Sequence, residues 1–100
     1  MAAGGRRRLR FEWDELKAHR NLKKHGVSFD DAATVLEDQL AVSVSDPDHS
    51  DDEQRYVVIG LSADGELLVV VYTERGNTIR IISGRSATKR ERKLYEEEPI

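Results

Sequence analysis

The sequence of 100 residues contains no cysteine and only two prolines. Without cysteine the chain has no disulfide framework, no thiolate nucleophile and no zinc–thiolate site, a composition that fits a reducing compartment. No apolar segment is long enough to cross a membrane. The arginines of the segment 1–8 precede no apolar run, so we expect no secretory signal and a cytoplasmic location.

The specific motifs of several catalytic and ligand-binding sites are also absent: there is no glycine-rich phosphate loop, no HExxH helix and no GxSxG nucleophile turn. The three histidines are not spaced as metal ligands, because His19 and His25 point about 240° apart on a predicted helix and His49 falls in a loop. The acidic loop over 46–53 does not provide the central glycine and terminal glutamate of an EF-hand. We therefore expect neither a metal nor a cofactor.

The chain is rich in charge, and the charge is unevenly placed. Residues 1–25 carry eight basic and three acidic groups (+5), residues 26–66 one basic and eleven acidic groups (−10), and residues 67–100 seven basic and five acidic groups (+2), which sum to the net charge of −3. A fold that brings the two basic ends to one face would form a site for a polyanion. The alternative is scattered charge on a solvated surface.

The length predicts a single domain over residues 9–98, preceded by a flexible basic arm over 1–8. Residues 9–13 alternate apolar and charged side chains, which predicts a half-buried strand. Asp14 is suited to cap the helix predicted over 15–24. One face of this helix is a polar stripe, made of Asp14, Lys17, Asn21, Lys24 and His25.

The segment Lys24-His25-Gly26-Val27-Ser28-Phe29 predicts a corner between two helices. Gly26 suits the left-handed conformation that ends a helix, and Ser28 is suited to cap the next one. Apolar residues at helical spacing then follow, namely Phe29, Ala32, Ala33 and Leu36. At the corner itself, Lys24 and His25 are either capping and solvated groups or reactive groups.

The second half of the chain predicts a sheet and a final helix. Strands are predicted over 40–45, 55–61, 67–73 and 78–83, and a helix over 89–98. Thr88 and Glu91 have the spacing of a capping box for that helix. The pairs Asp64-Gly65 and Gly76-Asn77 suit tight hairpin turns, so the last three strands form an antiparallel meander.

The turns also predict a register. If both loops have two residues, Arg55 lies opposite Glu74, Ile59 opposite Val70, and Tyr72 opposite both Val57 and Ile81. The other face of the sheet then carries Tyr56, Thr73 and Arg80. A one-residue change in either loop would exchange the faces.

Cations recur on the ordered elements: Lys24, His25, Arg55, Arg75, Arg80 and Arg85. Cleavage of RNA without a metal needs a base for the 2′-OH, an acid for the leaving oxygen and cations for the phosphate, since RNA supplies the nucleophile itself. This set of residues suits that reaction. The structural alternatives are that His25 only caps a helix, that Lys24 is solvated, and that Arg55 pairs with a nearby glutamate.

Several segments together resemble the BrnT family of bacterial ribonuclease toxins. They are FEWDELKAHRNLKKHGVSFDDA, Glu53-Gln54-Arg55, Gly60-Leu61-Ser62 and VVVYTERGNTIRIISGRSATKRE. The most specific parts are the corner at 24–29 and the segment Arg80-Ile81-Ile82-Ser83-Gly84-Arg85. The resemblance runs from residue 11 to residue 95, and Gly84 stands where the family usually has alanine.

The resemblance implies an α+β, RelE-like fold, in which two N-terminal helices and a C-terminal helix pack on an antiparallel sheet. It implies metal-independent cleavage of RNA that inhibits translation. It also implies a BrnA-like ribbon-helix-helix antitoxin as partner, which neutralises the toxin. The complex, expected to be 2:2, would bind operator DNA through the antitoxin.

The resemblance further implies the positions of the active site, which are Lys24, His25, Glu53, Arg55, Arg80 and Arg85, and adds Arg75 and Tyr72 to them. We expect His25 and Glu53 to transfer protons. We expect Lys24, Arg55 and Arg80 to bind phosphate and stabilise the transition state. The RNA chain would be held by Arg75, Arg85 and Tyr72.

This interpretation requires the corner to face Arg55 and Arg80 across a groove. The rival interpretation is a non-catalytic module, an inactive toxin homologue that binds RNA or acts only as a co-repressor.

Overall fold

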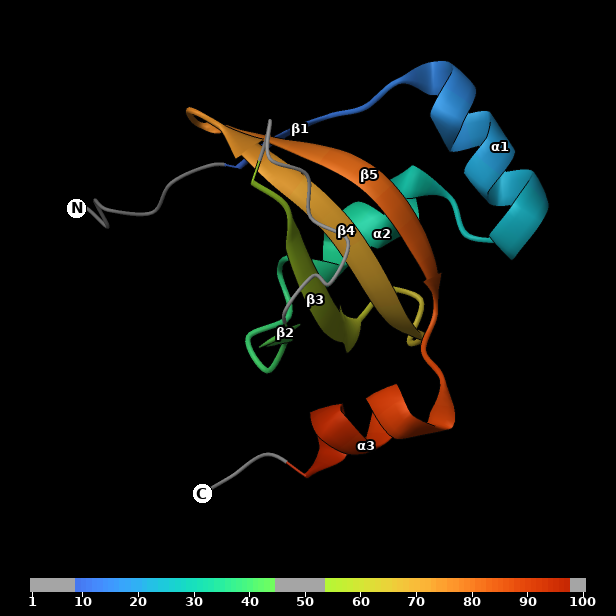
Figure 1. Cartoon of the computed structure of the whole chain (residues 1–100), viewed down its shortest axis with the longest axis vertical. Helices are drawn as coiled ribbons and strands as arrows, with labels where there is room; N and C mark the ends of the chain where they lie inside the picture. Colours follow the sequence, from blue (N-terminus) through green and yellow to red (C-terminus); the bar gives the residue numbers. More distant parts are fainter. Residues whose placement is uncertain (1–8, 45–53, 98–100) are drawn as a thin grey trace.

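The computed structural model describes residues 9–44 and 54–97 (Figure 1). The expected basic arm over 1–8, the acidic loop over 46–53 and Glu53 lie outside the described residues. Within the described ranges the strands are β1 (Arg10–Glu12), β2 (Val42–Val44), β3 (Tyr56–Leu61), β4 (Leu67–Arg75) and β5 (Thr78–Ser86), and the helices are α1 (Glu15–His25), α2 (Phe29–Val35) and α3 (Lys89–Glu96). None of these helices is long and apolar enough to cross a membrane.

The strands form one mixed sheet in the order β1-β5-β4-β3-β2. Strands β3 to β5 form the predicted antiparallel meander, and β2 also pairs with β3 in antiparallel orientation. The prediction of an antiparallel sheet is wrong for β1, which pairs with β5 in parallel. No hairpin turn joins β1 to its partner, so the sequence held no local signal for its direction.

The corner between α1 and α2 forms as predicted. Asp14 caps α1 by accepting two amide hydrogen bonds. Gly26 ends α1 with a φ of 72°, and its amide donates to the carbonyl of Leu22. Ser28 caps α2, because its hydroxyl accepts a hydrogen bond from the amide of Asp31 at 3.0 Å. These local contacts fix the direction in which the chain turns from one helix into the next.

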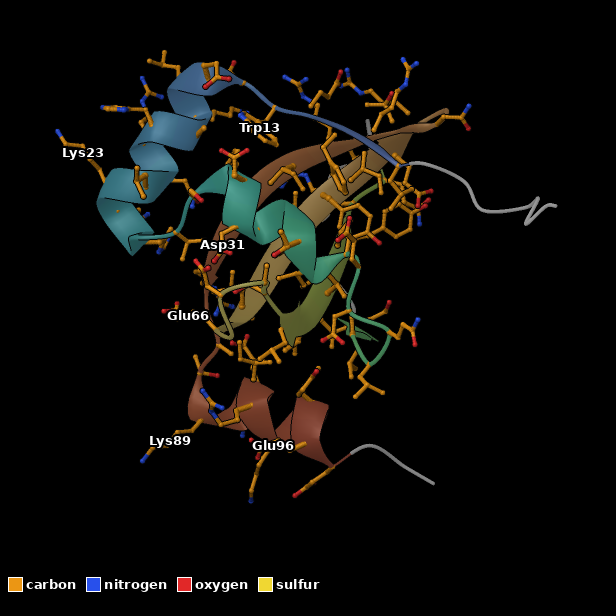
Figure 2. All side chains as sticks on the ribbon, turned by 180° about the vertical axis from the view of Figure 1, so that it is seen from behind. Trp13, Lys23, Asp31, Glu66, Lys89 and Glu96 are labelled. Carbon is orange, nitrogen blue, oxygen red and sulfur yellow. The ribbon has the colours of Figure 1, made fainter. Side chains whose placement is uncertain are left out.

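Helix α2 covers one face of the sheet, which we call the α2 face (Figure 1). The predicted apolar positions Phe29, Ala32 and Ala33 are buried, whereas Leu36 is only partly buried. They pack on sheet residues that include Val58, Leu68, Val70, Ile79 and Ile81. In the reverse view, α2 lies in front of the strands and α1 lies beside it, along the β5 side of the sheet (Figure 2).

The hairpin between β3 and β4 differs from the prediction by one residue. Its loop has three residues rather than two, because Leu61 still pairs with Leu67 and the amide of Gly65, at a φ of 84°, donates to the carbonyl of Ser62. A turn followed by a left-handed glycine is a common three-residue hairpin loop. Tyr72 therefore lies opposite Tyr56 and not Val57.

The additional loop residue also changes the other predicted pairs of β3. Val57 lies opposite Val71, and Ile59 lies opposite Val69 rather than Val70. Counting back by alternation, Arg55 falls opposite Thr73 rather than Glu74. The second hairpin has the predicted two-residue loop, and Tyr72 lies opposite Ile81 as predicted.

A β-bulge in β5 changes the face of later residues. Tyr72 pairs with Ile81 and Val71 with Ser83, which leaves Ile82 without a counterpart on β4. Arg80 and Arg85 are five residues apart and would lie on opposite faces of a regular strand. The extra residue brings both to the face opposite α2, which we call the arginine face.

Helix α3 packs on the arginine face at the end formed by β3 and the start of β4. Tyr95 of α3 contacts a second apolar cluster, formed by Val57, Ile59, Leu67 and Val69. The hydroxyl of Tyr95 donates to Asp38 at 2.7 Å. The carboxylate of Asp38 also accepts the amide of Leu61 at 2.8 Å, so one acidic side chain ties α3 to the loop after α2 and to the end of β3.

Candidate functional site

A polar row crosses the arginine face at the end away from α3. Glu12 of β1 lies opposite Arg80 of β5, and Arg80 lies opposite Thr73 of β4. The hydroxyl of Thr73 donates to the carbonyl of Gln54 at 2.6 Å, which fixes the chain as it enters β3. Continuing the alternation of β3 back by one residue places Arg55 on this face as well. The one-residue slip in the first hairpin therefore brings Arg55 and Arg80 to the same face, where the predicted register had separated them.

Arg80 is held in this row by an ion pair. Its Nη1 atom donates to Oε2 of Glu12 at 2.9 Å, and the two side chains are 31% and 41% exposed. The charge of Arg80 also acts on Asp14, whose pKa is lowered mainly by the amide hydrogen bond from Lys17 and, to a smaller extent, by this guanidinium. Arg80 thus lies near the start of α1 and remains partly open to solvent.

The corner residues lie at the other end of α1. Lys24 and His25 are exposed in its last turn. They line an open depression of about 330 Å³ whose other lining residues are Lys17, Arg20, Asn21, Ile82 and Ser83. Four of these seven residues are basic side chains of α1, which suits the binding of an anion.

The depression does not include Arg80 or Arg55. Ser83, on its wall, lies on the arginine face three residues beyond Arg80, which corresponds to about 10 Å along a strand. The structure therefore places the corner beside the strand that carries Arg80, but it does not bring Lys24 and His25 into one pocket with both arginines.

Asn21 fixes the corner against the sheet. Its side chain is buried, and its Nδ2 atom donates to the carbonyls of Val27 at 2.9 Å and Gly84 at 2.8 Å. The amide of Gly84 donates back to Oδ1 at 3.3 Å. The predicted polar stripe of α1 is therefore turned toward β5, and its central residue joins α1, the corner and the sheet.

Arg85 is engaged at the start of α3. Its two Nη atoms donate to the two carboxylate oxygens of Glu91, both at 2.8 Å. Glu91 also completes the predicted capping box with Thr88. The hydrogen bonds from Arg85 lower the pKa of Glu91 to about 2, and the same contact raises the pKa of Arg85. In this structure Arg85 stabilises the connection between β5 and α3.

Two further predicted RNA-binding residues lie on different faces. Tyr72 stacks on Tyr56 with ring centroids 5.4 Å apart, on the α2 face. Its pKa is raised, first by burial and then by the charge of Glu74. Arg75 is exposed at the end of β4, opposite Thr78, on the arginine face. The structure thus brings Arg75 to the same face as Arg80 and separates Tyr72 from both.

Glu12 and Asn21 are two residues of this region that the sequence did not predict as part of the site. The signal for Glu12 was its alternation with the apolar residue Phe11 in a short strand. The signal for Asn21 was an amide in the middle of a helix, where it has low helical propensity. Among residues 9–44 and 54–97, no three His, Cys, Asp or Glu side chains gather in a way that would hold a metal ion.

Comparisons with known proteins identify the family of this chain. The sequence model of the family described as "Ribonuclease toxin, BrnT, of type II toxin-antitoxin system" matches residues 13–91. The crystal structure of the Brucella abortus ribonuclease toxin BrnT is similar, with a TM-score of 0.62 and 27% sequence identity over 82% of this chain and 100% of that chain. A comparison with curated protein sequences gave no match. The family match covers most of the chain, so the protein belongs to the BrnT family of ribonuclease toxins of type II toxin-antitoxin systems.

Proposed function

We propose that this protein is an endoribonuclease that cleaves RNA without a metal ion and thereby inhibits translation. The proposal rests on the row on the arginine face. Arg80 of β5 and, by the alternation of β3, Arg55 lie on this face, and β5 also borders the Lys24–His25 corner. Family membership supports ribonuclease activity in general. The row adds cations on one face of the sheet, which suits contact with the phosphates of RNA.

In the proposed reaction a base removes the proton from the 2′-OH, and the 2′-oxygen attacks the adjacent phosphorus. An acid gives a proton to the departing 5′-oxygen. The products are a 2′,3′-cyclic phosphate and a free 5′-OH. His25 and Glu53 are the proposed proton-transfer groups, and Arg80 and Arg55 are proposed to stabilise the charge that develops on the phosphate.

The remaining cations have supporting roles in this proposal. Lys24 binds the RNA backbone together with the basic side chains of its depression, and Arg75 extends that contact along the arginine face. Arg85 would contact RNA while it is paired with Glu91. Tyr72 lies on the α2 face, so we leave it out of the proposed phosphate site.

Membership in a type II toxin-antitoxin family implies an antitoxin partner. We propose that this partner is a BrnA-like ribbon-helix-helix protein, that the complex is 2:2, and that it binds operator DNA through the antitoxin. The proposed kinship with RelE-like toxins is supported by the layered arrangement of helices on an antiparallel meander.

Purified protein incubated with total RNA, with and without EDTA, tests the proposal. We expect fragments that end in a cyclic phosphate, formed at the same rate in both reactions, and little cleavage by His25→Ala. Cleavage that stops with EDTA would contradict the metal-free mechanism. Binding of RNA without any cleavage would instead identify a non-catalytic module.

A further inference from the structure

We propose that Glu12 is a positioning residue for Arg80 in RNA cleavage, an inference that rests on the proposed function. The basis is the contact between the two side chains across the parallel pair β1–β5, where Nη1 of Arg80 lies 2.9 Å from Oε2 of Glu12. Glu12 does not touch the reacting atoms in this account. It acts by fixing where the guanidinium lies.

The ion pair leaves much of Arg80 available. A guanidinium has five N–H donors, and within the described part of the chain the contact with Glu12 engages Nη1. Arg80 is half-buried, with 31% of its side chain exposed. A phosphate can therefore bind to the remaining N–H groups while the carboxylate of Glu12 stays in place.

The backbone on both sides of Glu12 is anchored to the core. Its neighbour Phe11 points to the α2 face and packs in the main core. On its other side, Trp13 packs edge-on against the buried ring of Phe29, with centroids 6.0 Å apart. The backbone of β1 is thus anchored on both sides of Glu12, so its carboxylate restrains the long and flexible side chain of Arg80.

A preorganised cation stabilises the transition state without first losing conformational freedom. The charge of Glu12 has the opposite effect on substrate binding, because a carboxylate beside the row repels RNA. Glu12 should therefore raise kcat without lowering KM. If Glu12 merely blocked Arg80 until RNA arrived, its removal would speed the reaction.

The test compares RNA cleavage by the wild type, Glu12→Gln, Glu12→Asp, Arg80→Ala and the double variant Glu12→Gln/Arg80→Ala, all as full-length protein. We expect Glu12→Gln to lower kcat about 10- to 100-fold with KM unchanged or lower. Glu12→Asp should recover part of the loss, and it also serves if Glu12→Gln does not fold. The double variant should be no slower than Arg80→Ala, since both changes remove the same interaction.

The matched control is Glu96→Gln, which removes a carboxylate that pairs with Arg92 at 3.7 Å on α3. It should cleave at the wild-type rate. An unchanged or higher kcat in Glu12→Gln would overturn this inference, and so would a double variant in which the two losses of kcat simply multiply. In either case cleavage by the wild type would still support the proposed function. Absence of wild-type cleavage would overturn both.

Discussion

Asn21 and Gly84, 63 residues apart, exchange two hydrogen bonds between a buried side-chain amide and the backbone of β5. The same amide donates to the carbonyl of Val27, within the corner. A single side chain therefore joins the last turns of α1, the entry to α2 and the strand that carries Arg80. The position of Lys24 and His25 relative to the sheet depends on this contact.

Asn21→Ala should destabilise the protein. The change leaves the buried carbonyls of Val27 and Gly84 without their donor, which costs about 2–4 kcal/mol in the free energy of unfolding. Urea denaturation followed by circular dichroism measures this loss. Lys23→Ala is the control, because Lys23 projects from the outer side of α1 into solvent (Figure 2). Equal stability of the two variants would show that the amide contact does not hold the corner.

Glu91→Gln should change how stability depends on pH. The pKa of Glu91 is lowered from 4.5 to about 2 by Arg85, so its contribution is present above the unfolded pKa and is lost as the pH falls from 4.5 toward 2. Because Arg85 is 40% exposed, solvent screening reduces this contribution to about 1–2 kcal/mol.

The measurement is the free energy of unfolding of both proteins at about pH 6 and about pH 2.5. The wild type should exceed Glu91→Gln at the higher pH, and the difference should shrink at the lower pH. A difference that does not depend on pH would rule out the ion pair as its cause.

Tyr95→Phe should loosen α3. The hydroxyl of Tyr95 donates to Asp38, whose carboxylate also accepts the amides of Leu40 and Leu61. Burial alone would raise the pKa of Asp38, but these hydrogen bonds hold it below its usual value. Losing a hydrogen bond to a charged group costs about 1.5–3 kcal/mol.

Hydrogen exchange of the α3 amides is the direct measurement for this variant. In Tyr95→Phe the amides of α3 should exchange faster than in the wild type, and the amides of α2 should exchange at the wild-type rate. Unchanged protection of α3 would mean that its apolar contacts with β3 suffice.

The features that sequence predicted well are local ones. Asp14, Gly26 and Ser28 act through contacts with residues two to four positions away, so their roles can be recognised from spacing alone. The capping box of Thr88 and Glu91 is of the same kind. These signals predicted the helix starts and the corner that presents Lys24 and His25.

The sheet register could not be predicted in the same way. Asp64-Gly65 is compatible with a two- or a three-residue loop, and the choice moves Arg55 from one face to the other. The bulge at Ile82 has no sequence signature of its own, yet it decides that Arg80 and Arg85 share a face. Both depend on how β3, β4 and β5 pack together.

The candidate site was predicted only in part for a related reason. The resemblance supplied Arg80 and the corner, but their partners come from distant parts of the chain, as with Glu12 and Asn21. Two residues that are 63 or 68 positions apart and contact each other leave no periodic pattern in the sequence. Only the fold brings such pairs together.

The most direct test of catalysis on the arginine face is the rate of RNA cleavage by Arg80→Ala. The control is Arg92→Ala, which changes an arginine of α3 whose side chain is 55% exposed. We expect kcat/KM to fall about 100-fold or more for Arg80→Ala, as for loss of a group that stabilises transition-state charge, and to stay near the wild-type value for Arg92→Ala. Circular dichroism and urea denaturation should show both variants folded. A folded Arg80→Ala that cleaves RNA at the wild-type rate would contradict the assignment of the arginine face as the catalytic surface.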